Sequence, residues 1–74
     1  MDDILTTREI EIGELIFNGL SNKEIAEELD VTEQTIKNRL MVIYDKLDIS
    51  NRTEFAVYIY NKEMREERDE DDNS

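Results

Sequence analysis

Two helical patterns with a very short gap between them fill the chain from Ser21 to Leu47. The first opens with Ser21 and Glu24, the spacing of a capping box, in which the hydroxyl and the carboxylate each accept a hydrogen bond from an unpaired backbone N–H. The apolar residues that follow lie at the spacing of one helical face: Ile25, Ala26 and Leu29. The pattern therefore predicts a short helix over residues 22–29.

A longer helical pattern begins directly after the first. Asp30 and Val31 interrupt the first pattern, and Thr32 has the side chain of a good N-cap. The next apolar residues recur at i, i+4, i+7 and i+11, which predicts a helix over residues 33–47: Ile36, Leu40, Ile43 and Leu47. A short helix, a tight turn and a longer helix form a helix-turn-helix, whose second helix can enter the major groove of a DNA duplex.

The segment before this pair carries the same signals. Thr6 with Glu9 repeats the capping-box spacing and predicts a helix over residues 7–18. Gly19 is placed to end that helix in a left-handed conformation. Its expected buried face is apolar: Ile10, Ile12, Leu15, Ile16 and Phe17.

The segment after the pair predicts a fourth helix and a tail. Asn51 with Glu54 opens a helical pattern over residues 52–64. Nothing in the sequence indicates a strand, so we expect an all-α fold, a compact four-helix domain over residues 1–62. Acidic residues then dominate, and like charges at this density oppose compaction, so we expect an acidic, disordered tail over residues 65–74.

The composition limits the classes of function. The chain has 74 residues, a formal net charge of −11 and no cysteine, histidine, proline or tryptophan. It lacks the commonest metal ligands and acid–base groups, and it has no glycine-rich phosphate loop, so we expect neither an enzyme nor a bound cofactor or metal. No signal peptide or membrane-spanning run is present, and we expect a soluble, cytoplasmic protein. The acidity conflicts with DNA binding, because duplex-binding domains usually present a basic surface.

The fourth predicted helix is apolar on nearly all sides between Phe55 and Tyr60. A terminal helix in a small domain has only one side to bury against its own core. The remaining apolar side indicates a second contact surface, and a homodimer is the simplest candidate. The residues expected at this interface are Phe55, Val57, Tyr58 and Asn61. The alternative is that Tyr58 and Tyr60 lie half exposed, with their hydroxyl groups in water.

Several motifs in the chain keep the spacing of one known family: Leu5-Thr6, Arg8-Glu9, Gly19 to Ala26, Val31 to Glu33, Thr35 to Asn38, Ile43-Tyr44, Lys46-Leu47 and Ser50 to Glu54. With them the chain resembles the LuxR-type (GerE/FixJ-like) helix-turn-helix domain over about Ile4 to Tyr60. The resemblance implies sequence-specific binding of duplex DNA, as a dimer joined through the fourth helix, to regulate transcription. Many relatives also carry an N-terminal phospho-acceptor or sensor domain, and this chain resembles the DNA-binding domain standing alone.

The resemblance also implies roles for individual residues. Lys37, Asn38 and Met41 occupy the base-facing places of the third helix, and helical geometry adds Gln34 on the same side. Lys37 could pair with guanine and Asn38 with adenine, whereas Met41 could touch a thymine methyl group. Asp45 lies on the same side and would repel a nearby phosphate. Positions that hold the DNA backbone in the family are taken by Asn22, Lys23, Thr32, Thr35, Arg39, Lys46 and Arg52.

Structural explanations and other functions remain open. Thr32 is an N-cap whether or not DNA is present, and Arg52 could pair with Asp48 or Glu54. The acidity favours a second hypothesis, in which the chain is a protein-binding antagonist that pairs with another LuxR-type regulator or with RNA polymerase. A third hypothesis, an adaptor resembling the DNA-contacting end of a sigma factor, accounts poorly for the flanking motifs.

Overall fold

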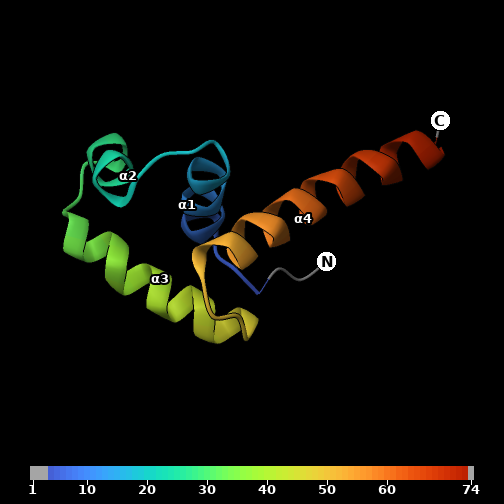
Figure 1. The fold of residues 1–74 in the computed structure, drawn as a ribbon. Helices are drawn as coiled ribbons and strands as arrows, with labels where there is room; N and C mark the ends of the chain where they lie inside the picture. The colour runs from blue at the N-terminus through green and yellow to red at the C-terminus, as the bar shows by residue number, and fades with distance from the viewer. Residues whose placement is uncertain (1–3, 74) are drawn as a thin grey trace.

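The computed structural model describes the backbone of residues 4–73 and the side chains of residues 4–65. Within that range it has four helices and no strand: α1 (Thr7–Phe17), α2 (Asn22–Leu29), α3 (Glu33–Leu47) and α4 (Arg52–Asn73). The predicted all-α fold is confirmed. Figure 1 shows α1 between α2 and the start of α4, and α3 along one edge of the molecule. None of the helices described here has the length and apolar character needed to cross a membrane.

The first two helices begin with complete capping boxes, as the sequence predicts. At the start of α1, the Glu9 N–H donates to Thr6 Oγ1 (3.2 Å) and the Thr6 N–H donates to Glu9 Oε1 (2.9 Å). At the start of α2, Ser21 and Glu24 make the same exchange at 3.1 and 2.8 Å. Each pair satisfies two backbone donors that the helix leaves unpaired, which fixes where the helix begins.

The starts of α3 and α4 use related caps. Thr32 Oγ1 accepts from the Thr35 N–H (3.1 Å), which confirms the predicted N-cap of α3. Asn51 Oδ1 accepts from the Glu54 N–H (2.9 Å) at the start of α4. The Glu54 carboxylate, however, accepts from the Ser50 N–H (2.7 Å), one residue before the cap. The capping box predicted from Asn51 and Glu54 is therefore only half formed, because the Glu54 carboxylate binds the N–H of Ser50 and not that of Asn51.

The first three helices all end in a left-handed residue followed by an apolar one. The φ angles are +94° at Gly19, +60° at Asp30 and +57° at Asp48. Only the glycine is free of a Cβ penalty in this region, although aspartate tolerates it better than most residues. The next residue then closes a Schellman motif by donating to a carbonyl in the last helical turn: Leu20 to Leu15 (3.1 Å), Val31 to Ala26 (2.9 Å) and Ile49 to Tyr44 (3.0 Å).

The core lies where the four helices meet. Its buried apolar residues come from every helix and from the segment before α1: Leu5, Ile12, Ile16, Ile25, Ala26, Ile36, Leu40, Ile43, Phe55 and Ile59. Gly13 allows α1 to approach α4 closely, because a Cβ at this position would lie 2.6 Å from Ile59 Cδ1 and 2.8 Å from Phe55 Cζ. Phe55 is fully buried, so its predicted place at a dimer interface is wrong. Its ring instead packs edge-on against Tyr44, with centroids 6.2 Å apart.

The fourth helix is longer than the sequence predicts. It continues through the acidic segment to Asn73, past the predicted end at residue 64, so residues 65–73 prolong α4. No glycine or proline interrupts this segment, which is rich in glutamate and arginine, and both are good helix formers. In Figure 1 the last turns of α4 extend beyond the other helices.

Candidate nucleic-acid interface

The outer side of α3 carries the residues predicted to read bases. Gln34, Lys37, Asn38 and Met41 are all exposed, whereas the apolar stripe on the opposite side of the helix is buried. Gln34 Nε2 donates to Asn38 Oδ1 (3.0 Å), so the two amides lie side by side along the helix. Because these side chains are exposed, the rest of the described chain leaves this side of α3 open to a ligand. Amide side chains match the donor and acceptor that adenine presents in the major groove.

Three exposed cations on α2 and α3 have no ion-pair partner among the described side chains. Lys23 is on the first turn of α2, and Lys37 and Arg39 are on α3. None of them forms an ion pair within residues 4–65. Exposed cations without partners can approach phosphate groups at little cost, so these three are the electrostatic part of the candidate interface.

The N-terminus of α3 uses both of its predicted hydroxyl groups for structure. Thr32 Oγ1 lies 2.9 Å from Thr35 Oγ1 and also caps the Thr35 N–H. The helix N-terminus itself favours an anion, because unpaired N–H groups and the helix dipole point toward it. The two threonines therefore shape this end of the helix, and their contact with phosphate stays a prediction.

Lys46 has a partner that the sequence does not reveal. Its Nζ donates to both carboxylate oxygens of Glu9, at 2.8 and 3.0 Å, and so joins the end of α3 to the start of α1. The Glu9 side chain is only 2% exposed and that of Lys46 is 31% exposed. A lysine that neutralises a buried carboxylate stabilises the fold, and its predicted DNA contact would have to be made alongside this pair.

The Glu9 carboxylate is held in its charged form. Burial alone would raise the pKa of Glu9, but the hydrogen bonds from Lys46 and from the Thr6 N–H, together with the Lys46 charge, outweigh it. The net result is a pKa below the ordinary glutamate value of 4.5. The capping box of α1 and the ion pair to α3 therefore share one ionised group.

Arg52 and Asn22, both predicted to hold the DNA backbone, bind each other. The Arg52 guanidinium donates to Asn22 Oδ1 (2.6 Å) and to the Leu20 carbonyl (2.5 Å). This arrangement ties the start of α4 to the start of α2, and both residues are half-buried. The two side chains thus hold the helix-turn-helix against the fourth helix.

Comparison with known proteins places the chain in a family. The family model for bacterial regulatory proteins of the luxR family, GerE, matches residues 3–59. The chain belongs to the LuxR family. It is 48% identical over 60 residues to the transcriptional regulatory protein LiaR of Bacillus subtilis. These 60 residues are 81% of this chain and 28% of LiaR. It is 40% identical over 60 residues to the nitrate/nitrite response regulator protein NarL of Escherichia coli, again covering 81% of this chain and 28% of NarL.

A third similar protein is also a transcriptional regulatory protein by name. The transcriptional regulatory protein LnrK of Bacillus subtilis is 50% identical over 54 residues, covering 73% of this chain and 24% of LnrK. The chain therefore spans about a quarter of the length of these regulators. The resemblance predicted from the sequence motifs is confirmed.

The LuxR-family domain leaves an apolar surface on α4 that overlaps the predicted interface only in part. Val57 is 51% exposed and Asn61 is exposed, whereas Tyr58 is half-buried against the core. Tyr60 is exposed and its ring stacks on Phe17 of α1, with centroids 5.9 Å apart and planes 29° apart. Phe17 is 44% exposed, although the helical pattern predicts that it faces the core. The exposed apolar surface consists of Phe17, Val57, Tyr60 and Met64.

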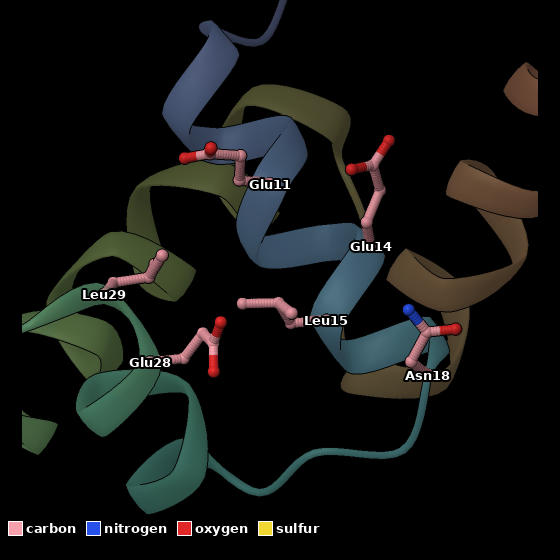
Figure 2. A pocket seen from close by; sticks show the side chains of 6 residues that line it. All are labelled: Glu11, Glu14, Leu15, Asn18, Glu28 and Leu29. Atoms are coloured by element: carbon pink, nitrogen blue, oxygen red, sulfur yellow. The ribbon is translucent and has the colours of Figure 1, made fainter.

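A second surface of the LuxR-family domain is acidic. A pocket of about 230 Å³ lies between α1 and α2. Figure 2 shows the side chains that line it, with Leu15 of α1 and Leu29 of α2 among them. The rest of the lining is polar or acidic: Glu11, Glu14, Asn18 and Glu28. The lining contains no cation, so the pocket repels phosphate and lies outside the candidate DNA interface. No group of three histidine, cysteine, aspartate or glutamate side chains in the described part of the chain is placed to hold a metal ion.

Proposed function

We propose that this LuxR-family domain regulates transcription by binding duplex DNA with sequence preference, as a homodimer with α3 in the major groove. The observation that carries the proposal is the outer side of α3, where Gln34, Lys37 and Asn38 are all exposed and the two amides are joined by a hydrogen bond. The names of the relatives, which are transcriptional regulatory proteins and a response regulator, support the same function.

The position of the charges explains how an acidic chain can bind DNA. Arg39 lies on α3 and Lys23 lies on the first turn of α2, which packs against α3. Neither forms an ion pair within residues 4–65, so both are available to phosphates beside the groove. Many of the acids lie in the pocket between α1 and α2 or in the acidic run of α4. Salt screens charges that are more than about 8–10 Å apart, so the cations act at contact range while the distant acids act weakly.

The DNA-binding proposal is tested by selection from a library of randomised duplexes, followed by affinity measurement on the enriched sequence. Lys37→Gln should weaken binding to that sequence about tenfold or more, because a lysine paired with a guanine edge contributes about 1–3 kcal/mol of discrimination. Arg8→Gln is the matched control, since it removes the same charge from α1, where Arg8 pairs with Glu11 at 3.7 Å. Equal losses in the two variants would mean that only overall charge matters and would contradict base reading by α3.

The homodimer is tested separately, because it rests on α4. Val57→Asp places a charge in the exposed apolar surface and should shift the protein from dimer to monomer in analytical ultracentrifugation. Met41→Asp is the control, because Met41 is also an exposed apolar residue but lies on α3. If both variants keep the mass of the wild type, or if the wild type is a monomer at every concentration, α4 does not form the dimer.

A second function is favoured by the acidic pocket and the net charge of −11. In this alternative the domain pairs with another LuxR-type regulator, or with the transcription machinery, and opposes DNA binding. Adding the domain to a purified LuxR-type regulator bound to its own operator separates the two functions. If the domain is an antagonist, it should displace the purified regulator from its operator and should select no duplex from the library. If it is a DNA-binding regulator, it should select a duplex and leave the purified regulator bound to its operator.

A further inference from the structure

α3 presents two adjacent apolar side chains to solvent. Met41 is 70% exposed and Val42 is 49% exposed, although the remaining apolar residues of this helix are buried or half-buried. Single exposed apolar residues are common, but two neighbouring ones on the exposed side of a helix are a candidate contact. The sequence motifs point to Met41 only, and Val42 enters through its exposure in the structure.

The pair is continuous with the amide side chains of the candidate interface. Met41 and Val42 follow Asn38 by three and four residues, so they lie one turn further along α3 and flank Asn38 on its two sides. Asn38 in turn accepts a hydrogen bond from Gln34. The outer side of α3 therefore runs from two amides to two apolar side chains, with Asp45 beyond them.

The chemistry of this strip matches thymine next to adenine. The C5 methyl group of thymine is the apolar group that a standard base edge presents in the major groove, and an asparagine amide pairs with adenine. The small number of unpaired cations near α3 strengthens the match. Because phosphate contacts are few, apolar contacts with base edges must supply a larger share of the affinity than in a basic domain.

We propose that Val42 is a specificity-determining residue that, together with Met41, contacts thymine methyl groups and selects thymine at neighbouring positions of each half-site. This inference rests on the proposed function, since it requires α3 to lie in the major groove. It adds a residue and a base preference to that function.

Replacing thymine by deoxyuridine tests the inference, because it removes the methyl group and keeps every hydrogen-bonding group of the base pair. Each thymine of the selected duplex is replaced in turn, and the affinity of the wild type is measured for each duplex. At the contacted positions the replacement should weaken binding about fourfold, which corresponds to one buried methyl group. Val42→Ala should abolish this thymine preference at one position, and Met41→Ala should abolish it at a neighbouring one.

Val31→Ala is the matched control, because Val31 is also an exposed valine but lies in the turn between α2 and α3. It should leave the ratio of thymine to deoxyuridine affinity unchanged, whatever it does to affinity itself. Equal binding of all thymine and deoxyuridine duplexes by the wild type would overturn the inference and leave the proposed function intact. If the selection enriches no sequence at all, the proposed function fails and the inference fails with it.

Discussion

Four cations that the sequence assigns to the DNA backbone divide into two pairs in the structure. Lys46 and Arg52 have partners within the domain: Lys46 binds Glu9, and Arg52 binds Asn22 and the Leu20 carbonyl. Lys23 and Arg39 are exposed and form no ion pair within residues 4–65. Each pair contains one cation of each type, so residue type does not decide the role. The partner that the fold provides decides whether a cation stabilises the domain or is available to a ligand.

The largest expected effect comes from removing the buried ion pair. Lys46→Ala leaves the Glu9 carboxylate buried without its cation and should lower the free energy of unfolding by about 3 kcal/mol. Lys23→Ala is the matched lysine variant and should change stability by less than about 0.5 kcal/mol, because Lys23 is exposed. Urea unfolding followed by circular dichroism measures both values. Similar losses in the two variants would erase the distinction between the two lysines.

The two arginines, Arg52 and Arg39, should differ in the same direction as the two lysines, with a smaller difference in stability. Arg52→Ala removes the hydrogen bonds to Asn22 and to the Leu20 carbonyl and should cost about 2 kcal/mol, since bonds from charged donors are stronger than neutral ones. Arg39→Ala should leave the unfolding midpoint almost unchanged and should weaken DNA binding instead. A stable Arg52→Ala protein with impaired DNA binding would reverse the roles that we assign to these residues.

Acid should remove the contribution of the Glu9–Lys46 pair. Because the pKa of Glu9 is lower in the folded protein than in the unfolded chain, its stabilisation is present above about pH 4.5 and is lost as the pH falls through the folded pKa. The difference in thermal stability between the wild type and Glu9→Gln should therefore narrow as the pH is lowered below 4.5. A difference that does not narrow at any acidic pH at which the protein stays folded would mean that the Glu9 carboxylate does not stabilise the fold through its charged form.

The smallest effect is expected in the turn that leads into α3, and it is a gain. Asp30 lies at φ +60° with its carboxylate at the negative end of α2, and glycine avoids both penalties. Asp30→Gly should stabilise the domain by about 0.5–1 kcal/mol without altering either pair of cations. A calorimetric scan checks the gain, and a loss of stability would show that the Asp30 side chain has a structural role of its own.

Local features of the fold were predictable, because they depend on residues close together in the sequence. The capping residues Thr6, Ser21 and Thr32 and the left-handed Gly19 are all found as expected. The left-handed conformation of Asp30 and Asp48, which end α2 and α3, was not predicted, although each is followed by an apolar residue, as Gly19 is. That shared pattern of a left-handed residue and an apolar neighbour is the signal that was missed.

Features that depend on packing between distant segments could not be predicted in the same way. Glu9 and Lys46 lie 37 residues apart, and nothing in either local pattern links them. A helix that is apolar on nearly all sides does not reveal which side faces the core, so Phe55 was placed at the interface and Tyr60 was not. The exposure of Val42 is equally invisible in the sequence, because the valine has no motif of its own.

The dependence of DNA affinity on salt tests the central claim most directly, namely that a few unpaired cations around α3 bind the duplex. Lys23→Gln should make the slope of log K against log salt concentration shallower by about 1, as expected for one lost phosphate contact. The double variant Glu9→Gln, Lys46→Gln replaces the ion pair by two amides without changing the net charge, and its slope should equal that of the wild type. An unchanged slope for Lys23→Gln, or an equal reduction in the double variant, would contradict the claim.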